Sequence, residues 1–121
     1  MELIQFPKIL DARGNLTFVE RLPFAIKRCY WLYHVPDGSL RGGHAHRTLD
    51  RVFISVAGRF KLNGIELSNP WEGMRVLPMT WVELTDFSNG AVCLVLASEE
   101  YDEADYIRDR VEFNRLTQVS A

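Results

Sequence analysis

Apolar residues along this chain come in short runs, which turn-favouring residues separate at intervals of roughly eight to twelve positions. The separating clusters include Pro36-Asp37-Gly38, Asn63-Gly64 and Ser88-Asn89-Gly90. Proline, glycine, asparagine and aspartate favour turns because they fix or tolerate the backbone angles that turns need. The pattern therefore predicts short strands, which we expect at residues 16–20, 27–34, 44–46, 51–57, 59–62, 73–77, 81–84 and 91–97.

The Asn63-Gly64 pair predicts a two-residue hairpin, because a type I′ turn needs a positive φ at both central positions. Before residue 99 no long segment has apolar residues at helical spacing, and residues 99–116 are expected to form a short terminal helix or a turn-rich tail. Many short antiparallel strands in one domain are typical of jelly rolls. We predict an all-β cupin/jelly-roll antiparallel β-barrel, formed by residues 1–121 as a single domain.

Charge and hydropathy narrow the classes of partner. The formal net charge is −2 and there is no basic stripe to neutralise phosphates, which argues against nucleic-acid binding. No run approaches the ~20 apolar residues of a membrane span. The N-terminus has no charged segment followed by a long apolar stretch, so no secretory signal is evident and we expect a cytoplasmic protein.

One stretch, from Gly38 to Gly58, matches the first motif of the cupin barrels, G-x5-H-x-H-x4-E-x6-G, at every position but one. The two motif histidines are His44 and His46, which lie two residues apart on a predicted strand and therefore point to the same face. Arg51 stands where metal-binding cupins have a glutamate ligand, and a guanidinium cannot lose its proton. We therefore expect no bound metal.

The second cupin motif is weaker. Its proline is present as Pro78, but Val82 and Glu83 stand where a histidine is expected, although Glu83 has an oxygen to donate. Without a metal, His44 and His46 become candidates for moving a proton between adjacent atoms of a substrate, since imidazole titrates near pH 6.5. The alternative is that both are hydrogen-bonded residues of a barrel wall.

Two further side chains are candidates for the same site. Arg41 precedes two glycines at a strand entrance, where a guanidinium suits a diphosphate through forked hydrogen bonds. Tyr33 is expected to supply a phenolic proton or to cover a sugar or base, with a packed core aromatic as the alternative. Strand alternation places Tyr33 with Trp31 on one face and Tyr30 on the other.

Over nearly its whole length the chain resembles the sugar 3,4-ketoisomerases of the FdtA/QdtA/WxcM-like group. The resembling segments are 11–16, 22–30, 41–47, 81–88, 94–98 and 101–108, and the most specific are RGGHAHR and YDEADYIR. The resemblance implies a small antiparallel barrel that forms a homodimer by exchanging N-terminal strands. It also implies a metal-free, cofactor-free enzyme that moves the ketone of dTDP-4-keto-6-deoxyglucose from C4 to C3, for aminosugars of O-antigens and surface-layer glycans.

The resemblance also implies roles for individual residues. His44 and His46 match the family histidines, and base and proton donor are assigned to this pair without choosing between them. Arg41 would hold the diphosphate or polarise the enediolate oxygen, and Tyr33 is the candidate catalytic tyrosine. Further substrate-binding candidates are Arg51, Arg13 and Glu83.

The chain departs from the family pattern at two places. Relatives usually have two histidines within the segment 81–88 that are absent here, one of them at Val82, and they usually have glutamine where Arg51 stands. Arg51 is expected to depress the histidine pKa by like-charge repulsion, or to recognise a carboxylate that the usual substrate lacks. The departures keep two rival functions open: a nucleotide-sugar binding module without activity, and a 3,5-epimerase-like activity on the same 4-keto sugar.

Overall fold

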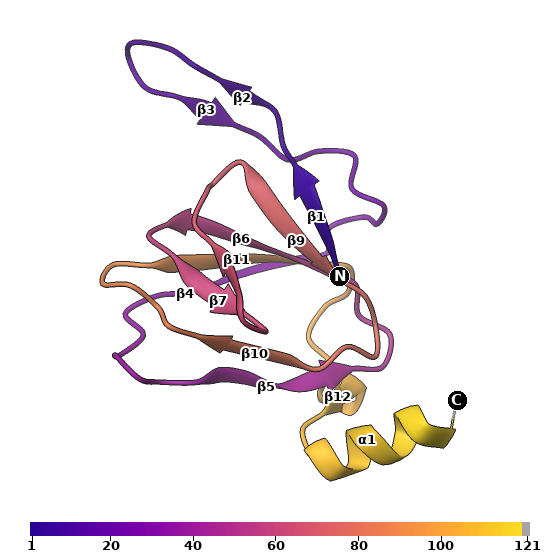
Figure 1. The fold of residues 1–121 in the computed structure, drawn as a ribbon. Coiled ribbons are helices and arrows are strands. Elements are labelled where there is room, and N and C mark those ends of the chain that lie inside the picture. The colour runs from indigo at the N-terminus through magenta and orange to yellow at the C-terminus, as the bar shows by residue number, and fades with distance from the viewer. Residues whose placement is uncertain (120–121) are drawn as a thin grey trace.

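The computed structural model describes residues 1–119, which form twelve strands, one short 3-10 helix and one α-helix (Figure 1). The elements in chain order are β1 (Glu2–Gln5), β2 (Lys8–Ile9), β3 (Leu16–Thr17), β4 (Arg28–Leu32), β5 (Arg41–His46), β6 (Arg51–Ala57), β7 (Phe60–Leu62), β8 (Ile65–Leu67), β9 (Glu72–Val76), β10 (Val82–Thr85), β11 (Val92–Ala97), η1 (Glu103–Asp105), β12 (Tyr106–Ile107) and α1 (Arg110–Val119).

Two five-stranded sheets face each other across the main core. One has the order β1-β9-β6-β11-β4 and the other β12-β5-β10-β7-β8, and all neighbouring strands are antiparallel. The core between them consists largely of aliphatic and aromatic side chains, among them Phe53, Phe60, Leu62 and Val95. The predicted all-β jelly-roll class is confirmed, with the two sheets remaining separate rather than joined into one closed ladder.

Strand β6 is buried on both faces, which explains its nearly continuous apolar sequence. Val52 and Ile54 face outward, where the N-terminal segment covers them through Phe6 and its neighbours. Arg51 and Phe53 alternate with them and face the space between the sheets. The period of two therefore directs the guanidinium of Arg51 into the interior.

Strand β5 carries a β-bulge, where its pairing with β10 shifts between Val82 and Glu83. Gly42 lies beside the bulge with φ of 82°, and a Cβ built there would lie 2.8 Å from the carbonyl oxygen of Val82. Only glycine fits this close approach of two backbones. We expected Gly42 and Gly43 to break the chain before a strand at 44–46, whereas the structure has both inside β5.

The predicted strands at 51–57 and 91–97 are observed nearly as expected, and so is the Asn63-Gly64 hairpin, in which Leu62 pairs with Ile65. Four strands were missed: β1, β2, β8 and β12. The strand predicted at 16–20 is only two residues long, because it pairs with β2 alone. The segment 99–116 combines both predicted outcomes, with turns around η1 followed by helix α1.

Hairpin β2–β3 and helix α1 lie on opposite sides of the molecule (Figure 1). The hairpin β2–β3 projects away from the two main sheets, whereas α1 lies along the outer side of β5 and β12 (Figure 1). Helix α1 covers a small apolar cluster formed by Ala45, Trp81, Ile107 and Phe113. No helix within residues 1–119 is long and apolar enough to cross a membrane.

Candidate active site

A cavity of about 520 Å³ opens between the two sheets. Its apolar wall is made by Leu32, Leu40, Phe53, Val82 and Leu84, and its polar wall by His44, Tyr30, Tyr106 and four arginines, Arg28, Arg41, Arg51 and Arg108. No aspartate or glutamate is among these lining residues. An interior with this charge selects anionic ligands.

Of the histidine pair predicted from the cupin motif, His44 lines this cavity and His46 lies directly beside it. His44 and His46 project from β5 with ring centroids 5.1 Å apart and planes nearly perpendicular. Both rings contact Tyr106 on the neighbouring strand β12, with centroid distances of 5.0 Å and 4.2 Å. The prediction that the two imidazoles lie together is confirmed; their chemical role stays a prediction.

Both imidazoles are held in the neutral form. Burial lowers the pKa of His44 from 6.5 to about 4, and the positive charge of Arg51 acts in the same direction. The pKa of His46 also falls to about 4, again first through burial and then through Arg51. A neutral imidazole has a free lone pair at pH 7, which a general base requires.

Asp105 fixes the orientation of His46. Its Oδ2 lies 3.0 Å from His46 Nδ1, and its Oδ1 accepts hydrogen bonds from the backbone N–H and the hydroxyl of Thr48. Burial raises the pKa of Asp105, but the hydrogen bonds from Thr48 and His46 outweigh it, so the net shift is downward. The ionised carboxylate places the proton of neutral His46 on Nδ1 and leaves the lone pair on Nε2, which has no hydrogen-bond partner.

Arg51 is the most buried charged residue of the site, with 1% of its surface exposed. Its Nε and Nη2 atoms have no hydrogen-bond partner. Burial lowers the pKa of the guanidinium, and a hydrogen bond with Tyr30 partly opposes this effect. Because arginine starts from a pKa above 12, the group stays charged at neutral pH.

The other arginines differ in how they are compensated. Arg108 donates two hydrogen bonds to the Glu103 carboxylate, at 2.7 Å and 2.9 Å, and these lower the pKa of Glu103 to about 2. Arg28 lies over the rings of Tyr30 and Tyr101, and its buried Nε has no partner. Arg41, at the start of β5, also lines the cavity.

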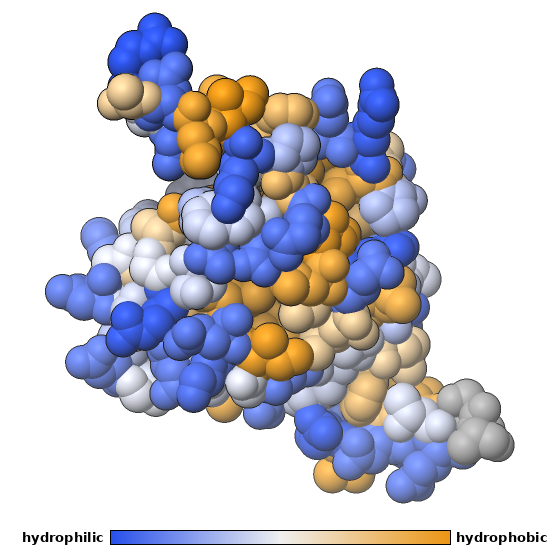
Figure 2. Space-filling model, turned by 45° about the horizontal axis from the view of Figure 1, so that its top comes forward, coloured by the Kyte–Doolittle hydropathy of each residue, from blue (hydrophilic) through white to orange (hydrophobic). Residues whose placement is uncertain are grey.

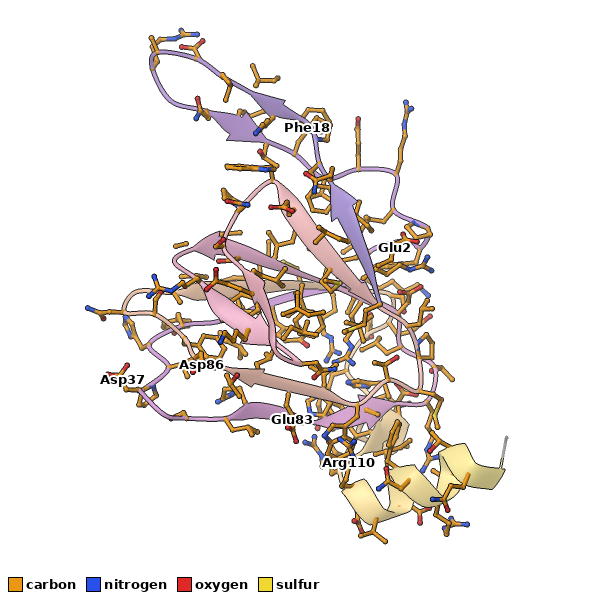
Figure 3. All side chains as sticks on the ribbon, in the orientation of Figure 1. Glu2, Phe18, Asp37, Glu83, Asp86 and Arg110 are labelled. Atoms are coloured by element: carbon orange, nitrogen blue, oxygen red, sulfur yellow. The ribbon has the colours of Figure 1, made fainter. Side chains whose placement is uncertain are left out.

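Three predicted site residues lie away from this chain's own cavity. Tyr33 is 58% exposed and follows the end of β4 on the side of Trp31, so the prediction that it joins the histidines is wrong for this cavity. Glu83 points to the outer side of β10, toward α1 (Figure 3), where its Oε2 accepts from Trp81 Nε1 at 3.1 Å. Arg13 is on the projecting hairpin, paired with Asp11 at 2.9 Å.

The residues that the sequence reasoning missed are Tyr30, Arg28, Tyr106 and Asp105. The alternation of β4 already contained the signal for the first two, since Arg28 and Tyr30 share the face that Tyr33 does not. Tyr106 and Asp105 lie in the YDEADYIR segment of the resemblance, but no strand alternation there indicates that they face the site. Their placement depends on β12 pairing with β5, so that Tyr106 lies opposite His46.

The donor set does not fit a metal ion. Within residues 1–119, no group of three or more His, Cys, Asp or Glu side chains is arranged to hold one. The residue next to the two imidazoles is instead the buried guanidinium of Arg51. A cation placed there would meet a fixed positive charge in an interior where repulsion is weakly screened.

Comparison with known families decides the relationship of this chain. Residues 1–118 match the FdtA family, described as WxcM-like, C-terminal. The chain belongs to this family. The fold, the paired histidines and the cation-lined cavity described above are therefore those of an FdtA-family, WxcM-like protein.

Characterised relatives are sugar-nucleotide isomerases. A TDP-4-oxo-6-deoxy-alpha-D-glucose-3,4-oxoisomerase from Aneurinibacillus thermoaerophilus is 38% identical, over 94% of this chain and 90% of its own length. QdtA, a sugar 3,4-ketoisomerase from Thermoanaerobacterium thermosaccharolyticum solved with TDP, superposes with a TM-score of 0.91 at 39% identity, over 98% and 95% of the two chains. A histidine-to-asparagine mutant of that QdtA, solved with TDP-4-keto-6-deoxyglucose, also has a TM-score of 0.91 at 39% identity, over 98% and 94% of the chains.

Proposed function

We propose that this FdtA-family protein is a TDP-sugar 3,4-ketoisomerase, which converts a dTDP-4-keto-6-deoxyhexose to its 3-keto isomer without a metal ion. The observation that carries the proposal is the neutral imidazole of His44 in a cavity lined by four arginines, with the neutral imidazole of His46 packed against it. A base in the neutral form and a surrounding positive charge are the two requirements for removing a proton next to a ketone.

The reaction begins with removal of the proton at C3, which the C4 carbonyl acidifies. One imidazole takes this proton, the C3–H electrons form a C3=C4 double bond, and the carbonyl electrons move to O4. The resulting enediolate carries a negative charge close to the cationic wall. The arginines that line the cavity stabilise that charge, since preorganised cations in a low-dielectric site need no reorganisation as the charge develops.

The reaction ends with the return of a proton at C4. The hydroxyl proton of O3 is lost while O4 gains one, the C3=C4 electrons take a proton at C4, and the ketone forms at C3. No proton or electron is consumed overall. The Asp105–His46 pair serves this step. Asp105 keeps a proton on Nδ1 of His46, so that Nε2 is the atom that takes up and releases the transferred proton, and the ring is neutral again after each cycle.

The nucleotide part binds through its diphosphate. Arg41 lines the cavity and offers a forked donor for the phosphate oxygens. A phosphate group there keeps the sugar over His44, three residues further along β5. This placement supports the assignment of Arg41 to substrate binding.

The proposed assembly is a homodimer with exchanged N-terminal strands. Hairpin β2–β3 pairs with neither main sheet and exposes Ile9, Leu10 and Leu16, which are more than half exposed. Apolar surface also lies on the body of the molecule beside the hairpin (Figure 2). Packing of the hairpin against a second copy would cover this surface and bring Arg13 to that copy, which would preserve the role predicted for Arg13 in substrate binding.

The decisive experiment incubates the purified protein with TDP-4-keto-6-deoxyglucose in D2O and follows the sugar by proton NMR. New 3-keto signals with deuterium at C4 are the expected result. Loss of the C5 proton instead would identify the rival 3,5-epimerase activity. Broadening of the nucleotide signals without any exchange would identify the rival binding module.

Variants of the two histidines test the assignment of base and donor. We expect His44→Asn and His46→Asn each to lower turnover by about 10²–10⁴-fold while TDP affinity stays within about threefold, because general acid–base groups contribute in that range. Sedimentation velocity on the same preparations tests the homodimer. A pathway toward O-antigen or lipopolysaccharide aminosugars and a cytoplasmic location stay predictions of the sequence.

A further inference from the structure

The end of the cavity at Arg51 holds positive charge that nothing in the described chain neutralises. Arg51 is 1% exposed, and its Nε and Nη2 lack hydrogen-bond partners. The buried Nε of Arg28 also lacks a partner. Neither arginine takes part in any of the ion pairs formed within residues 1–119. An unpaired buried charge is unfavourable unless a ligand supplies the counter-charge.

These two guanidinium groups are neighbours in the same sheet. Ala97 on β11 pairs with Arg28 on β4 at one side and with Arg51 on β6 at the other. Residues at the same level of adjacent strands point to the same face, so Arg28 and Arg51 both enter the space between the sheets, where they line the cavity. Together they present several N–H donors to one region.

The cavity therefore has two separate cationic ends. Arg41 begins β5 and His44 lies three residues further along, about 10 Å at the rise of an extended strand. Arg51 follows the other end of β5 after the turn that joins β5 to β6. A sugar ring at His44 thus lies between one end that suits the diphosphate and another end that still requires an anion.

We propose that Arg51 and Arg28 form a second anion subsite, so that this ketoisomerase prefers a nucleotide-linked sugar with a carboxylate in place of the 6-methyl group and binds the 6-deoxyhexose less tightly. The inference rests on the proposed function, since it assumes that the diphosphate lies toward Arg41 and the sugar over His44. A carboxylate matches a guanidinium through two parallel hydrogen bonds, which would satisfy the unpartnered N–H groups. A methyl group at the same position would leave both cations unpaired throughout the bound state.

A permanent anion explains the site better than the reaction's transient charge. The enediolate oxygen is negative only during turnover, whereas Arg51 is buried and unpaired at all times. Arg108 provides an internal comparison, because the same cavity contains this arginine with its charge balanced by Glu103. The chain therefore neutralises one cavity arginine itself and leaves Arg51 for the ligand.

Calorimetric titration with two unreactive probes, TDP-glucuronic acid and TDP-glucose, tests the subsite. We expect the wild-type protein to bind TDP-glucuronic acid about tenfold or more tightly than TDP-glucose. Arg51→Gln should abolish this preference, so that the two probes bind with about equal affinity, and should change the affinity for TDP-glucose by less than about threefold. Arg41→Gln is the matched control, since it should weaken both probes equally and keep their ratio.

The outcomes separate this inference from the proposed function. Equal affinities in the wild type would overturn the subsite, and the ketoisomerase would stand if TDP-4-keto-6-deoxyglucose were still isomerised. A preference that survives Arg51→Gln would overturn the assignment to Arg51. If neither probe bound, both proposals would fail. The wild-type ratio decides the matter even if Arg51→Gln does not fold, and Arg51→Lys, which keeps the charge but loses the fork, should then give an intermediate ratio.

Discussion

In the proposed mechanism, the charge of Arg51 helps to set the pH at which His44 and His46 can act as bases. Both His44 and His46 have a pKa of about 4 instead of 6.5, with burial as the first cause and Arg51 as the second. Arg51→Gln removes the positive charge and restores part of that difference. Since a general base works only while it is neutral, activity is lost as the pH falls through its pKa. A higher pKa therefore moves the loss of activity to higher pH.

The size of the effect follows from the order of the two causes. Because burial accounts for the larger part of the drop, Arg51 accounts for less than half of it. We therefore expect the acidic limb of kcat/KM to move upward by about one pH unit in Arg51→Gln, which is about 1.4 kcal/mol of differential interaction. At a pH well below the histidine pKa, Arg51→Gln should therefore have about tenfold lower kcat/KM than the wild type because fewer of its imidazoles are neutral.

The assay is the pH profile of kcat/KM with TDP-4-keto-6-deoxyglucose, followed by NMR between about pH 4 and 8, because this ratio reports the pKa of the free enzyme. Arg41→Gln is the control, since Arg41 lines the cavity but is not among the groups that shift the pKa of His44 or His46. It should lower kcat/KM without moving the limb. An unchanged or lowered limb in Arg51→Gln would refute the role given to its charge.

Three further predictions concern the same framework. His44 and His46 have a pKa of about 4 in the folded protein and protonate near pH 6.5 when unfolded, so the unfolded state binds more protons between about pH 6.5 and 4. The free energy of unfolding, measured by urea titration, should therefore fall by about 2 kcal/mol from pH 7 to 5, a figure that is reduced for solvent screening. A variant with both histidines replaced by glutamine should lose this pH dependence. Gly42→Ala should destabilise the protein by about 2–3 kcal/mol, which is about 1 kcal/mol or more beyond the effect of Gly43→Ala. Both glycines have a positive φ, but only a Cβ at Gly42 would meet a backbone oxygen, at 2.8 Å. Equal losses of stability in thermal denaturation would contradict this close approach. Asp105→Asn should lower kcat by about 10–100-fold with TDP affinity unchanged, because an amide no longer fixes the Nδ1–H tautomer; an equal loss of affinity would indicate a merely structural role.

The fold was predictable where local pattern decides it. The Asn63-Gly64 turn is specified by two adjacent residues, and β6 by its own apolar run. Strands that depend on a distant partner were missed. Strand β1 exists because Leu3 and its neighbours pair with β9 some seventy residues later, and β12 because Ile107 pairs with Ala45. Neither segment has alternation strong enough to indicate this in advance.

The site was predictable where alternation and motif spacing place side chains on one strand face. This holds for His44, His46 and Arg51, which the structure brings together. Tyr33 follows the end of β4 and lies outside this cavity, where the aromatic residue from β4 is Tyr30; the catalytic role of Tyr33 stays a prediction. Glu83 was a candidate because of its place in the motif, whereas the alternation of β10 turns Val82 and Leu84 toward the cavity and Glu83 away from it.

The two roles inferred for Arg51 make a joint prediction for the kinetics. In the free enzyme its charge is unpaired and the pKa of the two histidines is low. A carboxylate bound to Arg51 would compensate that charge, so the pKa in the complex would rise toward 6.5. The pH profile of kcat reports the pKa in the enzyme–substrate complex. For a carboxylated substrate, the acidic limb of kcat should therefore lie at higher pH than the acidic limb of kcat/KM. For a neutral sugar the two limbs should lie closer together. Binding of the matching substrate would in this way strengthen the base at the moment it is needed, while the empty site keeps both imidazoles unprotonated and ready.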